Sequence, residues 1–462
     1  MRTSKRERNY ALEHFNEVHH TTLNPEGPGV VRIHLVPPKI VDGEVGASVA
    51  IINGQDVIPV NRAWSILLTE FIEEVNVYAG REINDEDAKN IVKLATARVK
   101  KVYPFVPKAM LRKGILRMMT TFKQVAYGEP TDESIGYLNI GEYAPLMKAP
   151  HRMDLMVSAM TKGGRWHCNQ NCVHCYAAGQ EQSSEEELST EDWKAILDKC
   201  RAVGIPQVTF TGGEPTMRED LPELIDHAKW FITRLNTNGI KLTKEYCEEL
   251  KKASLDSCQI TFYSWNEEVH NKLVGAPKYQ ETVAGIENAI AAGINLSINT
   301  PLCTLNKDYV KTLEFLHEKG VLYVTCSGLI TTGNAAMEAS EELQLSLAEV
   351  REILKESVDY CYKNGMEISF TSPGWVDENF CKELGISTPN CGACLSNMAI
   401  TPGGNVVPCQ SWLSDEPLGN FLAEDWEKIW DGEACKERRD FSTKMRCECP
   451  LRIYRGKAGA EE

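Results

Sequence analysis

The sequence predicts an α/β protein whose central part is an open, partial (β/α)6 barrel of the TIM type. Between Met153 and about Ile330, short apolar runs alternate with amphipathic segments, and glycines follow several of the helical patterns. This alternation is typical of right-handed βαβ units and a parallel sheet. Six units are too few to close an eight-stranded barrel, so we expect a lateral opening, with the chemistry at the carboxyl ends of the strands.

Each expected strand is a short apolar run bounded by turn residues. The six runs are Met153–Ser158, Gln207–Thr211, Phe231–Leu235, Gln259–Tyr263, Asn295–Asn299 and Leu322–Cys326. Ser189 and Asp192 form an N-cap pattern that opens the first intervening helix. Further helices are expected at Leu221–Ala228, Lys244–Ala253, Tyr279–Ala292 and Asp308–Lys319.

Composition excludes several classes of protein. The chain has 462 residues and a formal net charge of −15, which argues against a nucleic-acid binder that works by bulk charge. No apolar run follows the basic N-terminus, and none reaches the ~18 residues of a membrane span, so we expect a cytoplasmic protein. Thiols stay reduced there, and clustered cysteines then favour metal or cluster ligands over disulfides.

Residues 1–150 are expected to form a separate unit that resembles a winged helix. Val49–Asn53 and Val57–Val60 predict a hairpin, and Asn61 begins a helical pattern after it. Asn84 begins a second helical pattern, and a third covers Met110–Val125. The rest divides into the barrel at 151–340 and a cysteine-rich region at 341–462. Two acidic groups are expected to be solvated faces: the connector 183–187 and the helical residues Glu70, Glu73, Glu74, Glu82, Asp85, Glu86 and Asp87.

Three cysteines occupy one short loop after the first expected strand. They are Cys168, Cys172 and Cys175, with His167 and His174 beside them. Iron–sulfur clusters are held by such thiolates, and three of them would leave one iron of a cubane cluster open for a small molecule. Zinc, with one of the two histidines as a fourth ligand, is the alternative.

The second expected strand ends in Gly212-Gly213-Glu214-Pro215. Alone, this pattern also fits a glycine turn leading into a helix. The βαβ order places it on the same face of the barrel as the cysteine loop. The glycines allow close backbone approach, and the Glu214 carboxylate can pair with an ammonium group.

A Cys-x3-Cys-x2-Cys loop followed by GGEP on the next strand resembles the radical S-adenosylmethionine (SAM) superfamily, over about Met153 to Ile330. The resemblance implies that Cys168, Cys172 and Cys175 bind a four-iron four-sulfur cluster whose open iron chelates the methionyl group of SAM. It also implies reductive cleavage of SAM to a 5′-deoxyadenosyl radical that abstracts hydrogen from substrate. No catalytic residue is assigned beyond the cluster. Residues implied in SAM binding are His174, Gly212, Gly213, Glu214, Thr261, Ser264 and Asn299; for the last three a structural role is the alternative.

A second cysteine group follows in the C-terminal region. The segment from Cys391 to Cys409 contains a Gly403-Gly404 turn, which predicts a hairpin that brings Cys409 toward Cys391 and Cys394. Together with the later LGN and WxxIW patterns, it resembles the SPASM/twitch extension that holds auxiliary clusters. The full pattern has more cysteines after Cys447 and Cys449, so we expect one auxiliary four-iron four-sulfur cluster. Its candidate ligands are Cys391, Cys394, Cys409, Cys447 and Cys449, and zinc is the alternative metal. For Cys381 and Cys435 a structural role is expected, with a contribution to the cluster as the alternative.

The N-terminal unit resembles recognition elements of enzymes that mature ribosomally made peptides (RiPPs), which add a leader peptide to a hairpin edge. A structural or oligomerisation role is the alternative. The resulting hypothesis is a peptide- or protein-modifying radical enzyme that forms a crosslink or thioether, epimerises or oxidises. Its partners would be the peptide and a flavodoxin- or ferredoxin-type electron donor, without nucleic acid or membrane. The alternatives are a small-molecule enzyme of cofactor or metabolite biosynthesis, a sulfatase-type maturase, and a non-catalytic iron–sulfur redox protein.

Overall fold

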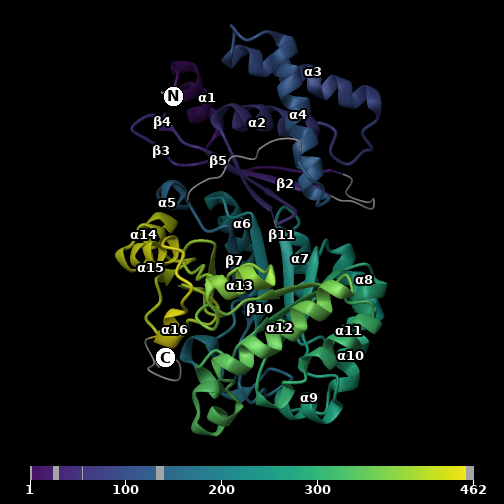
Figure 1. Cartoon of the computed structure of the whole chain (residues 1–462). Helices are drawn as coiled ribbons and strands as arrows, with labels where there is room; N and C mark the ends of the chain where they lie inside the picture. The colour runs from purple at the N-terminus through teal and green to yellow at the C-terminus, as the bar shows by residue number, and fades with distance from the viewer. Residues whose placement is uncertain (1–2, 24–30, 55, 132–139, 454–462) are drawn as a thin grey trace. The chain divides into compact units, whose positions relative to one another are not determined.

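Contacts within a computed structural model divide the chain into two units (Figure 1). One consists of Met1–Ala149 with Lys199–Gln207, and the other of Pro150–Asp198 with Val208–Glu462. The structure describes residues 3–23, 31–54, 56–131 and 140–453. Within these ranges, no helix is long and apolar enough to cross a bilayer.

The first unit contains a four-stranded antiparallel sheet with the strand order β1-β2-β5-β6. The expected hairpin is confirmed as β5 and β6, with Ile52 opposite Asp56. The three expected helices are confirmed as α2, α3 and α4, and the side chains of Asn61 and Asn84 cap the first two. The bounds are α1 Lys5–His14, β1 His19–Leu23, β2 Val31–Val36, β3 Ile40–Val41, β4 Glu44–Val45, β5 Ser48–Ile52, β6 Asp56–Val60, α2 Arg62–Asn76, α3 Asp85–Val102, α4 Lys108–Ala126 and α5 Ile140–Tyr143.

The acidic residues on α2 do not form the expected solvated face. Glu70 and Glu74 are only 3% exposed. Arg98 on α3 reaches all three glutamates, with its Nε 2.7 Å from Glu74 and its Nη1 2.9 Å from Glu73 and 3.8 Å from Glu70. The sequence interpretation was wrong here because Arg98 lies on the next helix, beyond the range of a pattern within α2.

The second unit is built on a ten-stranded sheet with the order β15-β14-β13-β12-β11-β10-β7-β16-β17-β18. All six expected strands are confirmed as β7 and β10 to β14. The pairs from β11 to β15 are parallel, as the βαβ pattern requires. Their bounds are β7 Arg152–Ser158, β10 Gln207–Gly212, β11 Ile232–Thr237, β12 Ser257–Thr261, β13 Asn295–Pro301 and β14 Tyr323–Ser327.

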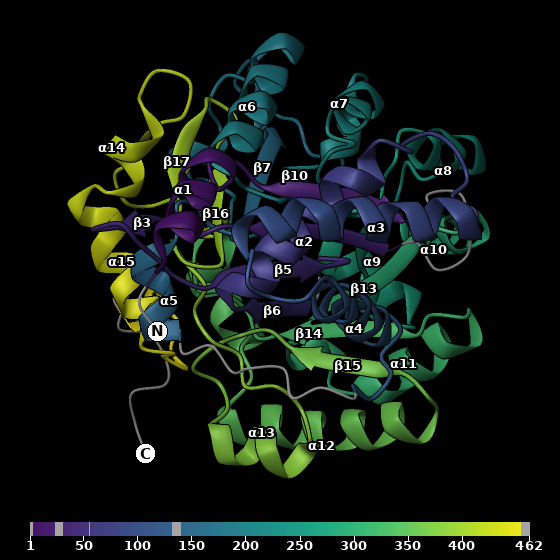
Figure 2. The ribbon, with the colours of Figure 1, turned by 90° about the horizontal axis from the view of Figure 1, so that it is seen from above.

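Helices form an arc around the strands, from α6 through α7, α8, α10 and α11 to α12 (Figure 2). The predicted helices are confirmed as α6 Thr190–Val203, α7 Leu221–His227, α8 Lys244–Lys252, α10 Tyr279–Ala291 and α11 Tyr309–Glu318. The structure adds α9 Glu267–Val274, α12 Leu347–Lys363 and β15 Glu367–Phe370. The parallel sheet therefore exceeds six strands. β15 escaped prediction because it has only four residues, two of them exposed.

The C-terminal region joins this sheet through β16, which pairs in parallel with β7. The expected hairpin around Gly403-Gly404 is confirmed, since Ala399 on β16 lies opposite Val407 on β17. The proposed boundary at residue 340 stays a prediction, and the tail after Ile453 lies outside the described residues. The bounds are α13 Glu378–Leu384, β16 Asn397–Ile400, β17 Asn405–Val407, β18 Gly419–Asn420, α14 Trp426–Trp430, α15 Glu433–Thr443 and α16 Pro450–Ile453.

The acidic connector 183–187 holds this hairpin instead of being merely solvated. Glu185 accepts hydrogen bonds from the Thr401 hydroxyl, the Gly403 backbone N–H and the Asn405 amide. These donors are more than 200 positions away, so no local pattern could have indicated them. The connector therefore ties the C-terminal hairpin to the barrel.

Candidate active site

The cysteine loop starts just beyond β7 and the small hairpin of β8 (Thr161–Lys162) and β9 (Arg165–Trp166). Its thiols rest on apolar side chains on two sides. Cys168 and Cys175 pack against a cluster that includes Met156 and Met160 from the end of β7. Cys172 packs against a second cluster that includes Leu273 and Val274 of α9.

The three thiols lie close enough to influence one another. Burial, followed by the Glu214 charge, raises the pKa of Cys168 to about 12. Burial and the charges of Cys175 and Cys168 raise the pKa of Cys172. Without a metal the loop therefore holds protonated thiols, and binding of a metal centre would displace their protons.

His174 points into the protein beneath this loop. Its Nε2 lies 3.1 Å from the Tyr263 hydroxyl, and the two rings meet edge to face with centroids 5.0 Å apart. Burial lowers the pKa of His174 to about 4, so the ring is neutral at neutral pH. Tyr263 was not singled out from the sequence, although it lies in the segment Thr261–Ser264 just after β12.

A segment after β14 holds the backbone of the cysteine loop. The Asn334 side-chain amide donates to the Cys172 carbonyl at 3.0 Å. The Asn334 backbone N–H donates to the Cys175 carbonyl at 2.9 Å. The hydroxyls of Thr332 and Ser340 donate to the carbonyls of Tyr176 and Val173. Sequence reasoning missed these contacts. The Thr-Thr-Gly-Asn turn at 331–334 was the available signal.

The GGEP turn packs directly on the start of the cysteine loop. Gly213 N–H donates to Ser158 O at 2.7 Å, and the Cys168 thiol lies 3.5 Å from Gly213 O. Gly212 has φ +132°, and a Cβ built on it would lie 2.2 Å from Ser158 O. No other residue allows this approach, so the glycines bring the ends of β7 and β10 together.

Glu214 is buried in this turn with a set of donors around it. Its Oε1 accepts from the hydroxyls of Thr216 and Thr237, each at 2.6 Å, and its Oε2 accepts from Asn238 N–H at 2.8 Å. Burial raises the pKa of Glu214, while these hydrogen bonds oppose the rise. The carboxylate is therefore fixed in orientation between β10 and β11.

The three polar residues expected near SAM lie in different environments. Thr261 at the end of β12 lies opposite Asn299 on β13, and the Asn299 amide oxygen accepts from the Thr325 hydroxyl at 2.9 Å. Ser264 is buried, and its hydroxyl accepts from Asn266 N–H at 3.1 Å in the turn before α9. SAM contacts by these three residues stay a prediction.

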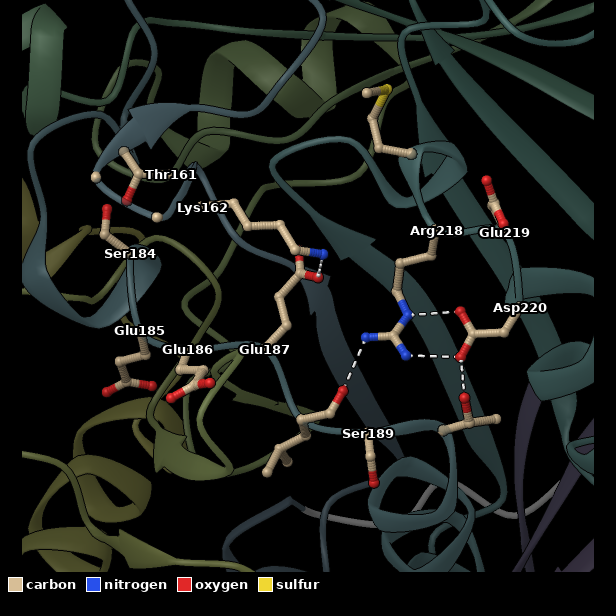
Figure 3. Close-up of a pocket in the computed structure, with 15 residues that line it drawn as sticks. Thr161, Lys162, Ser184, Glu185, Glu186, Glu187, Ser189, Arg218, Glu219 and Asp220 are labelled. Atoms are coloured by element: carbon tan, nitrogen blue, oxygen red, sulfur yellow. Dashed lines mark hydrogen bonds and ion pairs between the residues drawn. The ribbon is translucent and has the colours of Figure 1, made fainter.

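A cleft of about 830 Å³ lies beside the β8–β9 hairpin, lined mainly by charged and hydroxyl-bearing residues (Figure 3). Its walls are held by ion pairs: Lys162 with Glu187 at 3.1 Å, and Arg218 with Asp220 at 2.6 Å. Glu187 also accepts from Ala159 N–H at 2.9 Å. The cleft residues therefore support the residues that precede the cysteine loop.

The C-terminal cysteines separate into three positions. Cys391, Cys409 and Cys449 pack around Trp412 and its neighbours. Burial raises the pKa of Cys409 to about 12, and the charges of Cys449 and Cys391 contribute, which places these three thiols near one another.

Cys394 and Cys447 have other contacts. Cys394 lies near Cys409, because its backbone N–H donates to Pro408 O at 3.4 Å. Cys394 is fully buried, with φ +54°, and its thiol interacts with Cys435. The hydrogen bond with Cys394 and the nearby Arg439 guanidinium lower the pKa of Cys435. Cys447 is 3.3 Å from the Asn390 amide oxygen. Cys435, expected to be merely structural, is thus the neighbour of a candidate ligand.

These donor sets fit clusters better than single ions. Each group brings at least three thiols near one another, and each thiolate of a cubane cluster binds a different iron. The soft thiol donors and their apolar surroundings suit iron–sulfur clusters.

Comparison with known proteins agrees with this site. Residues 167–316 match the radical SAM superfamily, and residues 391–450 match SPASM, an iron–sulfur cluster-binding domain. An AdoMet-dependent heme synthase of Oleidesulfovibrio alaskensis is 31% identical over 281 residues, 57% of this chain and 71% of that protein. A PqqA peptide cyclase of Streptomyces rochei is 26% identical over 274 residues, 57% of this chain and 72% of that protein.

Similarity in fold extends further along the chain than similarity in sequence. SuiB of Streptococcus suis, solved with SAM bound, aligns with a TM-score of 0.61 and 14% identity over 92% of this chain and 96% of SuiB. SuiB has also been solved with its precursor peptide SuiA. The chain therefore belongs to the radical SAM superfamily, carries a SPASM domain, and uses four-iron four-sulfur clusters and SAM as cofactors.

Proposed function

We propose that this radical SAM enzyme modifies a peptide or protein substrate. The observation that carries the proposal is the extent of the likeness to SuiB. It covers 92% of the chain, more than the cluster-binding regions alone, and SuiB binds a precursor peptide. The products considered are a crosslink, a thioether, an epimerised residue or an oxidised side chain.

The roles of the chain's own residues follow from their positions. Cys168, Cys172 and Cys175 would hold the SAM cluster, and Gly212, Gly213 and Glu214 would position the methionyl group of SAM. When bound, the cluster and SAM supply reductive carbon–sulfur cleavage and a radical that abstracts hydrogen. Cys391, Cys409 and Cys449 would hold an auxiliary cluster, with Cys394 as the fourth candidate. A flavodoxin or ferredoxin would donate the electrons.

The first unit supports a role in peptide recognition. In the described residues, β6 is an edge strand of its sheet and pairs with β5 alone. An added peptide strand would use the outward main-chain groups of β6, although Pro59 offers no N–H. Leader binding at this edge is therefore the specific form of the proposal.

The test uses reconstituted protein with SAM, dithionite and peptides encoded beside its gene. A mass change in one peptide, together with 5′-deoxyadenosine, would support the proposal. A variant lacking residues 1–149 is expected to keep SAM cleavage and lose peptide affinity. Absence of 5′-deoxyadenosine from the reconstituted enzyme would contradict radical chemistry, and unchanged affinity in the deletion variant would contradict leader binding.

A small-molecule substrate is the second candidate, because the relative from Oleidesulfovibrio alaskensis is named a heme synthase. The alignment with that relative covers 57% of this chain, less than the alignment with SuiB covers. Anaerobic incubation with iron porphyrins, followed by mass spectrometry, distinguishes the two candidates. A modified porphyrin, with affinity unchanged by loss of residues 1–149, would favour this candidate over the peptide.

A further inference from the structure

The inner face of the barrel carries charged groups well below the cysteine loop. Along a strand, successive side chains alternate between the two faces of the sheet. Leu155, Phe210 and Leu235 lie on the buried, helix-covered face and are 0% exposed. Asp154 on β7 and Arg234 on β11 each immediately precede one of these residues, so their side chains lie on the other, inner face.

Two guanidiniums share a single carboxylate there. Arg152 Nε is 2.9 Å from Asp154 Oδ1, and its Nη2 is 3.3 Å from Oδ2, so the pair is bidentate. Arg234 lies near both groups, since only β10 separates β11 from β7 in the sheet. Burial and the charge of Arg152 lower the pKa of Arg234, whereas the charge of Asp154 raises it. Arg234 makes no hydrogen bond or ion pair within the described residues. The group therefore has one excess positive charge in a chain of net charge −15.

The group lies on the same face of the sheet as the residues that support the cysteine loop. Met156, two residues after Asp154 on β7, packs against Cys168, Cys175 and Tyr176. Asn236 lies on the same face of β11 as Arg234, two residues closer to the carboxyl end of the strand. A molecule bound to Arg234 could thus extend along this face toward the carboxyl ends of the strands.

The neighbouring wall is polar. Gln259 on β12 donates to the Ser297 and Thr325 hydroxyls at 3.4 and 3.3 Å. Thr325 in turn donates to the Asn299 amide oxygen. These uncharged side chains form hydrogen bonds with one another. None of these bonds involves Arg234.

We propose that Arg234, beside the Arg152–Asp154 pair, binds a carboxylate of the substrate inside the barrel. A half-buried guanidinium beside a second guanidinium carries an uncompensated positive charge, and a bidentate carboxylate is the ligand that matches its geometry. This inference rests on the proposed function only in treating the inner face as the substrate chamber. It names the substrate class as a carboxylate, supplied by either a peptide side chain or a small molecule.

The test is arginine labelling of the full-length protein by phenylglyoxal, read site by site by mass spectrometry. Glutarate is expected to slow labelling of Arg234 severalfold, whereas the diamide glutaramide does not. Arg165, exposed on β9, is the control and should label equally under all conditions. Equal effects of glutarate and glutaramide on Arg234, or no effect of either, would overturn the proposal.

A second arm distinguishes the source of the carboxylate. The capped peptide acetyl-Gly-Glu-Gly-amide is compared with its Gln counterpart. Protection by the Glu peptide assigns a peptide carboxylate, and protection by glutarate alone assigns a small molecule.

Variants of Arg234 test its role directly. In Arg234→Gln, the protection of Arg152 by glutarate should fall about tenfold, and Arg234→Lys should retain part of that protection. Unchanged protection of Arg152 in Arg234→Gln would contradict the assignment. Labelling requires no turnover, so its outcome is independent of the peptide-modification assay.

Discussion

At the scale of single residues, Glu214 shows how one side chain serves both packing and chemistry. It is 1% exposed and accepts hydrogen bonds from Thr216, Thr237 and Asn238. These donors come from the turn after β10 and from the end of β11, so Glu214 links two strands at their carboxyl ends. A carboxylate fixed in this way can meet an ammonium group without reorganising.

We expect Glu214→Ala to weaken SAM binding and to lower the stability of the protein by about 1–3 kcal/mol, because its three buried donor residues lose their acceptor. Binding can be followed by equilibrium dialysis, and stability by urea denaturation. Glu219→Ala is the matched control, since Glu219 is exposed five residues later. Equal SAM affinity in both variants would argue against the role of Glu214.

The positions of the C-terminal cysteines predict unequal effects of their removal. Cys409 lies with Cys391 and Cys449, whereas Cys447 contacts Asn390. Cys409→Ser should therefore lower iron content by about one cluster, because a cubane cluster relies on its thiolate ligands. Cys447→Ser should leave iron content close to that of the wild type. Iron and sulfide analysis after anaerobic reconstitution measures the cluster content of both variants. A larger loss of iron in Cys447→Ser than in Cys409→Ser would refute this ligand set.

At the scale of elements, the cysteine loop depends on segments that are distant in sequence. The turn after β10 supports its start, and the turn after β14 holds its carbonyls. Loops at the carboxyl ends of parallel strands meet at one edge of the sheet. The loop is therefore positioned before any cluster binds.

Gly212→Ala is expected to disrupt this edge. The added Cβ would lie 2.2 Å from Ser158 O, and the backbone already has φ +132°. The combined cost should exceed about 2 kcal/mol and reduce cluster incorporation. Gly163→Ala is the control, because Gly163 also has a positive φ, +56°, but a Cβ there has no atom within 4 Å. If Gly212→Ala and Gly163→Ala lost equal amounts of thermal stability and iron, the contact of Gly212 with β7 would be unimportant.

At the scale of the molecule, the first unit has a hydrophobic cluster of its own. That cluster runs from Tyr10 on α1 to Phe122 on α4, and its members all belong to residues before 150. The second unit is organised around its parallel sheet and the two cysteine groups. Separate cores allow each unit to unfold as its own cooperative element.

Scanning calorimetry should therefore resolve two transitions. Removal of iron by a chelator is expected to lower only the second-unit transition, because clusters stabilise the state that binds them. The transition of the first unit serves as the internal control. A single transition that shifts as a whole after iron removal would show that the units unfold together.

Local sequence patterns determined much of the fold. The six strands, the hairpin at β5 and β6 and the helix starts at Asn61 and Asn84 depend on periodicity and capping within a few residues. For the same reason the motifs at Cys168–Cys175 and Gly212–Glu214 were sufficient to indicate the chemistry. The short β15 and the pairing of β16 with β7 carried no comparable local signal.

Tertiary structure decided which distant groups meet. Arg98 forms ion pairs with glutamates that look solvated in α2, and Glu185 holds a hairpin more than 200 residues away. Arg152, Asp154 and Arg234 come together only because β7, β10 and β11 lie side by side. Sequence by itself determined the family and the cofactors, since the motifs that indicate them are short segments of the chain. The arrangement inside the barrel depends on strand order and register, which set the contacts between residues far apart in sequence.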